Sequence, residues 1–298
     1  MTTFEPPRSA ESATATGTRP RRTEGEGTRM GAPDRHIWDG ATDGRHGQIR
    51  VDLVSFTSST RTVMNLLLTS AGISNPSISD ALVDLLGKPI AESSALFIPT
   101  AIYPFPGGGK GAAEALSGAA SSPLCDLGWK SLGLLELTAL PSIQRESWVS
   151  TLQETDALLV WGGNVLYLCH WMRQSGLAEL LPSLEHLAYV GVSAGSIAMT
   201  PYNCDAESNR RFVPPGSDMS LEADRALGLV DFTMWVHIDN PDPIFEEHSM
   251  ANVEKWAAGV PVPTYAIDDA TAIKVSGDTG EVVSEGHWRV FDPTTASS

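Results

Sequence analysis

Short apolar runs alternate with amphipathic segments from residue 64 to about residue 200. The apolar runs, each bounded by turn residues, predict buried strands at 64–70, 95–98, 132–137, 157–160 and 187–190. The intervening segments predict helices at 75–86, 111–120, 142–153 and 166–174. Strands that alternate with helices form a parallel sheet covered on both faces, with functional loops at the carboxyl ends of the strands. The sequence therefore predicts an α/β three-layer sandwich with a mostly parallel sheet.

The two ends of the chain follow other patterns. Residues 1–63 are rich in Thr, Gly, Arg, Glu, Pro and Ser, and only 51–56 hints at structure. Such a composition cannot bury enough apolar surface to offset the entropy of ordering, so we expect a disordered, dispensable extension. Residues 64–298 are expected to form a single α/β domain. Within it, 272–275 and 282–283 predict a C-terminal hairpin.

Composition narrows the classes of partner. The net charge of −16 argues against nucleic acid, because affinity for it rests on neutralising phosphates with Lys and Arg. We find no apolar run long enough to cross a membrane and no secretory signal. Cys125, Cys169 and Cys204 are odd in number and widely spaced, which favours neither disulfides nor a zinc site. We expect a cytoplasmic protein without metal or cofactor, and the sequence leaves a homodimer open.

The strongest chemical signal is the segment Gly191-Val192-Ser193-Ala194-Gly195, which follows the apolar run 187–190. A serine on a sharp strand-to-helix turn has a strained backbone, so its neighbours must be small and the helix must begin at once. The N–H of Ala194 then lies at a helix N-terminus, where it can stabilise an oxyanion. Ser193 is therefore the candidate nucleophile.

A serine hydroxyl needs a general base that is itself oriented by a third group. His237 follows the apolar run 229–236, which predicts a strand. We therefore expect His237 at the same sheet edge as Ser193, and this placement favours it as the base over the other six histidines.

Three further segments have candidate roles. The Gly162-Gly163 pair follows the strand predicted at 157–160, and the N–H of either glycine can supply a second oxyanion donor. Residues 107–110 look like a phosphate loop but lack the Ser or Thr that the motif needs, so we interpret them as a mobile loop. The adjacent acids Asp268 and Asp269 precede a predicted strand and are interpreted as a solvated turn.

Several motifs occur in a fixed order along the chain. They are Met64 to Gly72, Phe97-Ile98-Pro99, Gly162-Gly163-Asn164, Tyr189 to Gly195, and Leu227-Gly228-Leu229 leading to His237. Together they resemble peptidase E, the aspartyl dipeptidase family of serine peptidases, whose relatives include cyanophycinase. The resemblance covers about 64–298. It implies a class I glutamine amidotransferase-like fold, with Ser193 as nucleophile, His237 as base, and Gly163 and Ala194 as oxyanion donors.

Three features depart from the family pattern. Trp161 stands where a glycine commonly precedes the Gly-Gly-Asn turn. The acidic member of the triad is open between Asp205, Glu207 and Asp218; Asp205 is favoured because it follows the predicted elbow helix. The dipeptidase is expected to carry a cation after its histidine, but here no Lys or Arg occurs between His237 and Lys255. Preference for an N-terminal aspartate is therefore not expected.

The leading hypothesis is a serine peptidase that hydrolyses short peptides through an acyl-enzyme on Ser193. The first alternative is an esterase-like α/β hydrolase, which shares the Gly-x-Ser-x-Gly motif but usually has further strands between the serine and the histidine. The second alternative is a non-catalytic binding protein on the amidotransferase-like scaffold.

Overall fold

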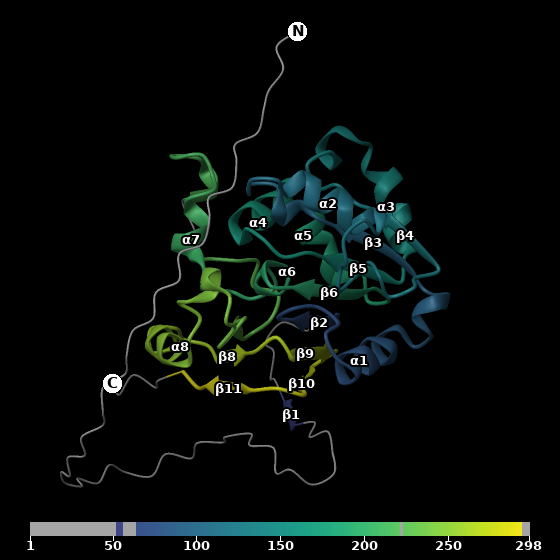
Figure 1. Cartoon of the computed structure of the whole chain (residues 1–298). Coiled ribbons are helices and arrows are strands. Elements are labelled where there is room, and N and C mark those ends of the chain that lie inside the picture. The colour runs from purple at the N-terminus through teal and green to yellow at the C-terminus, as the bar shows by residue number, and fades with distance from the viewer. Residues whose placement is uncertain (1–51, 56–63, 221–222, 294–298) are drawn as a thin grey trace, which may run out of the picture. The chain divides into compact units, whose positions relative to one another are not determined.

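The computed structural model describes residues 52–55, 64–220 and 223–293, all within the unit Trp38–Ser298. These residues form a large sheet covered by helices on both faces, and a smaller sheet beside it (Figure 1). The strands are β1 (Asp52–Ser55), β2 (Asn65–Thr69), β3 (Ser94–Ile98), β4 (Ser131–Leu134), β5 (Ala157–Val160), β6 (Ala188–Val192), β7 (Thr233–Trp235), β8 (Thr264–Ile267), β9 (Thr271–Ser276), β10 (Thr279–Ser284) and β11 (Trp288–Phe291).

The helices connect most of these strands. The α-helices are α1 (Pro76–Leu86), α2 (Gly108–Ser117), α3 (Arg145–Gln153), α4 (Val165–Gln174), α5 (Leu177–Leu180), α6 (Ala194–Ile197), α7 (Ala206–Arg210) and α8 (Met250–Ala257). The 3₁₀ helices are η1 (Ile90–Glu92), η2 (Thr100–Ile102), η3 (Leu140–Ser142), η4 (Leu181–Ser183), η5 (Asp218–Ser220) and η6 (Pro243–Phe245).

The large sheet has the strand order β1-β10-β9-β2-β6-β5-β3-β4. From β2 to β4 the neighbouring strands are all parallel, whereas β9 runs antiparallel to β2, and β10 and β1 extend this antiparallel edge. The small sheet has the order β11-β8-β7. The chain passes directly from β8 in the small sheet to β9 in the large one, so the two sheets meet at residues 268–270.

The central strands are apolar on both faces because helices cover both. In β5, Leu158 and Val160 pack with α3, α4, α5 and α6, whereas Ala157 and Leu159 pack with α1 and α2 on the opposite face. This division follows from right-handed crossovers: the connections through α1 and α2 run toward the β4 edge, and those through α3 and α4 return. The small sheet adds Met234 and other side chains to the α4 side of the core.

Most predicted elements are confirmed, including the hairpin of β9 and β10. Several predictions are wrong in extent. The strand predicted at 132–137 ends at Leu134, and the helix predicted at 142–153 begins at Arg145. The strand predicted at 229–236 is only β7, and residues 108–110 form the first turn of α2 rather than a mobile loop. Gly108 permits this turn because a Cβ there would lie 2.0 Å from the carbonyl oxygen of Ile102. Most of the predicted 1–63 extension lies outside the described residues; β1 is described, and it pairs with β10.

Candidate active site

Ser193 occupies a strained turn between β6 and α6, with φ of 51° and ψ of −112°. The two glycines around it are required by close contacts. A Cβ on Gly191 would lie 2.7 Å from the amide nitrogen of Ser196, and a Cβ on Gly195 would lie 2.3 Å from the carbonyl oxygen of Val160. Both contacts are closer than real Cβ atoms adopt, so the turn can close only with glycine at these positions.

The Gly162-Gly163 turn runs beside Ser193. A Cβ built on Gly162 would lie 3.2 Å from the Cβ of Ser193, and Gly163 has φ of 139°, which a residue with a side chain rarely adopts. In the part of the chain that the structure describes, the N–H groups of Gly163 and Ala194 have no hydrogen-bond acceptor. Two free N–H groups on the turns around Ser193 are the donors that an oxyanion needs.

Two consecutive residues at the carboxyl end of β2 tie the serine turn to the histidine. The carbonyl oxygen of Thr69 accepts a hydrogen bond from the N–H of Ser193 at 3.1 Å. The hydroxyl of Ser70, which is fully buried, accepts one from the N–H of His237 at 2.8 Å. The backbones of Ser193 and His237 are thus both fixed to the end of β2.

The ring of His237 is held by Asp269. Its Nδ1 lies 2.6 Å from Oδ1 of Asp269, to which the Ser70 hydroxyl also donates at 2.7 Å; Asn240 donates to the other carboxylate oxygen. Burial alone would raise the pKa of Asp269, but the hydrogen bonds from His237, Ser70 and Asn240 outweigh it and lower the pKa to about 2. A carboxylate that is ionised at neutral pH accepts only, so Nδ1 of His237 carries the proton and Nε2 is free to accept one.

The three acids that the sequence offered for the triad lie away from His237. Asp205 lies 3.4 Å from Nε2 of His248, Glu207 is exposed and pairs with Arg210, and Asp218 is exposed on η5; among the described contacts none of them reaches His237. The interpretation of Asp268 and Asp269 as a solvated turn is wrong, because both residues are half-buried and Asp269 is hydrogen-bonded to His237, Ser70 and Asn240. The sequence did contain a signal that could have identified Asp269, because it follows the apolar strand β8 just as His237 follows β7.

The expectation that Ser193 and His237 lie at the edge of one sheet is also corrected. Ser193 ends β6 in the large sheet, whereas His237 follows β7 in the small sheet. Apolar periodicity indicates a strand but not the sheet to which the strand belongs. His237 is nonetheless buried, with 8% of its surface exposed, and has a left-handed backbone with φ of 58°.

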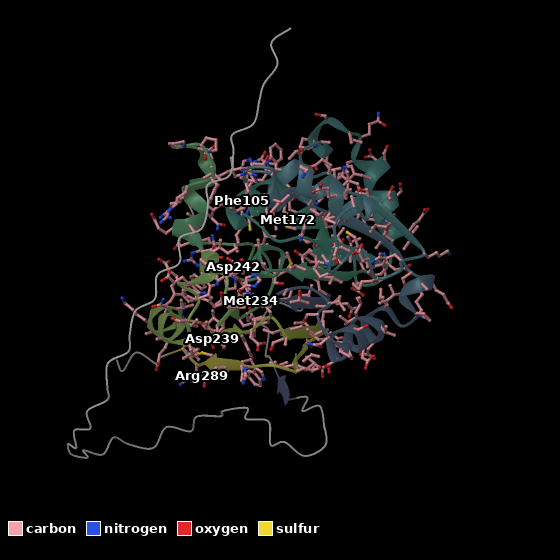
Figure 2. The ribbon with its side chains drawn as sticks, viewed as in Figure 1. Phe105, Met172, Met234, Asp239, Asp242 and Arg289 are labelled. Atoms are coloured by element: carbon pink, nitrogen blue, oxygen red, sulfur yellow. The ribbon has the colours of Figure 1, made fainter. Side chains whose placement is uncertain are left out.

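The connection from β7 to α8 forms a loop against the histidine. Phe245 stacks on the ring of His237 with the ring centroids 4.2 Å apart. The loop also exposes four acidic side chains and no Lys or Arg; Figure 2 labels two of them, Asp239 and Asp242. These acids are Asp239, Asp242, Glu246 and Glu247.

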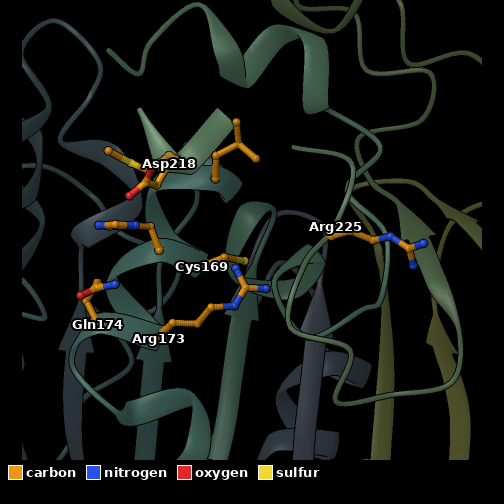
Figure 3. Close-up of a pocket in the computed structure, with 8 residues that line it drawn as sticks. Cys169, Arg173, Gln174, Asp218 and Arg225 are labelled. Carbon is orange, nitrogen blue, oxygen red and sulfur yellow. The ribbon is translucent and has the colours of Figure 1, made fainter. Parts of the chain in front are cut away.

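A separate cavity of about 240 Å³ lies along α4 (Figure 3). Its lining includes His170 and Arg173 of α4, Asp218 of η5, and Arg225, and neither Ser193 nor His237. Asp218, which the sequence offered as a third candidate for the acid, therefore faces His170 rather than His237.

We found no helix among the described residues with the length and apolar character needed to span a bilayer.

Comparison with known proteins identifies the fold and the family. Peptidase E of Streptomyces coelicolor (strain ATCC BAA-471 / A3(2) / M145) is 28% identical over 153 residues, which are 50% of this chain and 60% of that protein. A crystal structure of a peptidase from an acI-B1 Actinobacterium matches with a TM-score of 0.52 at 16% identity, over 78% of this chain and 95% of that one. This likeness confirms the predicted class I glutamine amidotransferase-like α/β sandwich.

The model of the family described as peptidase family S51 matches residues 66–283, which is most of the chain and contains the serine turn, His237 and Asp269. The resemblance to peptidase E inferred from the sequence is thereby confirmed. The chain belongs to peptidase family S51, a family of serine peptidases.

Proposed function

We propose that this chain hydrolyses short peptides through an acyl-enzyme on Ser193. The observation that carries the proposal is the convergence at the end of β2. There, Thr69 holds the backbone of Ser193 in its strained turn, and Ser70 holds the backbone of His237. Because Thr69 and Ser70 are consecutive, these bonds bring the strained serine and the buried, oriented histidine to the same strand end, which supports nucleophilic acyl transfer.

In the proposed reaction, Nε2 of His237 takes the proton of the Ser193 hydroxyl as the oxygen attacks the peptide carbonyl. The N–H groups of Gly163 and Ala194 stabilise the resulting oxyanion. His237 then donates the proton to the departing amine, and water, activated by the same histidine, hydrolyses the ester on Ser193.

Asp269 is proposed as the acidic member of the triad in place of Asp205. It accepts from Nδ1 of His237 at 2.6 Å, and its lowered pKa keeps it ionised across the pH range in which the histidine must act. The carboxylate fixes the tautomer of His237 and stabilises the imidazolium that forms during attack.

The proposed substrates are short peptides whose N-terminal residue is neutral. A bound aspartate side chain would require a cationic partner, because leaving a buried carboxylate unpaired is costly. The loop after His237 instead carries the exposed acids Asp239 and Asp242. A reducing, cytoplasmic setting is part of the proposal, and it suits the three free cysteines.

A library of dipeptides and tripeptides with free N-termini tests the function, with matched ester substrates in parallel. We expect peptide hydrolysis by the wild type and none by Ser193→Ala. Hydrolysis of esters alone would favour the esterase-like alternative. Binding of peptides with no turnover of either class would favour the non-catalytic alternative.

A further inference from the structure

A second buried histidine stands behind the proposed base. Nδ1 of His248 lies 2.7 Å from the carbonyl oxygen of Val236, and Nε2 lies 3.4 Å from Oδ1 of Asp205. The side chain of His248 is 10% exposed and that of Asp205 is 22% exposed. The rings of Trp235 and Phe245 pack at centroid distances of 5.9 and 5.2 Å, so this histidine is enclosed by apolar surface as well.

This geometry favours a bound proton. A backbone carbonyl only accepts hydrogen bonds, so Nδ1 of His248 carries hydrogen. An ionised carboxylate also only accepts, so its contact with Nε2 at 3.4 Å is most favourable when Nε2 carries hydrogen as well. An imidazolium paired with a carboxylate therefore suits both contacts, which makes the pair a candidate bound-proton site.

On one side the pair holds the loop that carries the base. The carbonyl oxygen of His248 accepts from the N–H of Asp239 at 3.0 Å, and the N–H of His248 donates to the carbonyl oxygen of Phe245 at 2.8 Å. The same loop supplies Phe245, which stacks on His237, and Asn240, which donates to Asp269. The position of His248 therefore sets the environment of both His237 and Asp269.

On the other side the pair holds the segment that supports the oxyanion turn. The carbonyl oxygen of Asp205 accepts from the N–H of Asn209 at 2.9 Å across α7. Oδ1 of Asn209 accepts from the N–H of Val165 at 2.6 Å, and the backbone carbonyl oxygen of Asn209 accepts from Nδ2 of Asn164 at 2.9 Å. Asn164 directly follows Gly163, so α7 fixes the turn that carries a proposed oxyanion donor.

We propose that His248 and Asp205 form a protonation-dependent positioning pair that joins the loop of the base to the turn of the oxyanion donor, and that peptide hydrolysis is fastest while the pair holds its proton. This inference rests on the proposed function for its effect on catalysis, although the pair itself is defined by the geometry alone. Both residues act through others, His248 through His237 and Asp205 through Asn209.

The direction of the pH effect follows from the surroundings of His248. Burial by itself lowers its pKa, but the hydrogen bond and charge of Asp205, the Val236 carbonyl bond and the charge of Glu247 together raise it above the usual 6.5. His237 is the other titratable ring nearby, 6.3 Å away between centroids. A raised pKa means that the pair persists to a higher pH than an ordinary histidine would allow, and is lost as the pH rises through the pKa of folded His248.

The test compares Asp205→Asn with the wild type by two measurements: the pH profile of kcat/KM and the NMR titration of the His248 ring. Wild-type activity is expected to fall on the alkaline side with the same midpoint as the His248 titration. In Asp205→Asn, both midpoints are expected to move to lower pH together, by about one unit, because an opposite charge at this distance is removed. The exposed Glu254→Gln change on α8 removes one negative charge without touching the pair, and is expected to leave both midpoints in place.

If the His248 midpoint moves in Asp205→Asn while the alkaline limb of activity stays, the pair does not act on catalysis and the inference is overturned. Failure of the proposed function is distinguishable, because it would appear as absent turnover in the wild type at every pH. In that case the coupling is measured by NMR from the amide chemical shifts of Asp239 and Gly163. Both shifts are expected to change with the same midpoint as the His248 titration in the wild type. Shifts that do not change with that titration would overturn the inference.

Discussion

Nδ1 of His237 and Oδ1 of Asp269 lie 2.6 Å apart, although the chain brings them from different places. His237 follows β7 in the small sheet, and Asp269 lies where the chain passes from the small sheet into the large one. Ser70, at the end of β2 in the large sheet, donates to the same carboxylate oxygen. The proposed acid thus stands at the junction of the two sheets, fixed from both.

Asp269→Asn is expected to lower kcat by about 10⁴-fold with little change in the folded structure. An amide can donate to Nδ1 of His237 and so favours the wrong tautomer, as in the serine protease template. Steady-state kinetics on a cleaved dipeptide measures the effect, and circular dichroism checks the fold.

The matched comparison is Asp205→Asn, assayed at a pH below the His248 midpoint that NMR measures in each of the two proteins. We expect near-normal turnover there, together with near-normal turnover in Glu207→Gln and Asp218→Asn. A loss as large in Asp205→Asn as in Asp269→Asn would return Asp205 to the role that the sequence first suggested.

The serine turn was predictable from the sequence because its shape depends on residues that are close together in the chain. Gly191 and Gly195 flank Ser193 between an apolar run and a helix. A Cβ at either position would lie too close to neighbouring backbone atoms, which explains why both residues are glycine. The proposed acid, Asp269, was not predictable in this way. Proximity in sequence favoured Asp205, but the pairing of β8 with β7 and β11 brings Asp269 to His237, and this pairing is a long-range outcome of packing.

Gly195→Ala is expected to destabilise the protein by about 1–3 kcal/mol or more, because the new Cβ would lie 2.3 Å from the backbone oxygen of Val160. Gly109→Ala in α2 is the control. Its added Cβ meets nothing within 4 Å, and replacing a helical glycine stabilises by about 0.5–1 kcal/mol. Urea unfolding of the two variants measures the difference. Equal stabilities would show that the elbow tolerates a side chain.

A chain that begins at Met64 lacks β1, which pairs with β10 over four residues. We expect its melting temperature to fall by a few degrees relative to a chain that begins at Val51, because β10 becomes an unpaired edge. Peptidase activity is expected to be retained, since the serine turn and His237 are fixed to β2. An unchanged melting temperature would show that β1 adds nothing to stability.

Asp-Leu is not expected to be a better substrate than Ala-Leu or Leu-Leu. The loop beside His237 offers exposed carboxylates rather than a cation to a negatively charged side chain. Comparing kcat/KM for the three dipeptides decides the question. A preference for Asp-Leu above about tenfold, roughly 1.4 kcal/mol, would show that a Lys or Arg from another segment of the chain reaches the pocket.

The central claim is that Ser193 is a nucleophile activated by His237, and covalent labelling tests it most directly. After reaction with a fluorophosphonate, peptide mapping by mass spectrometry is expected to find one adduct, on Ser193. The adduct should be absent from Ser193→Ala, strongly reduced in His237→Ala, and unchanged in Ser183→Ala, which alters an exposed serine on η4. An unlabelled wild type, or an adduct that persists in Ser193→Ala, would contradict the account.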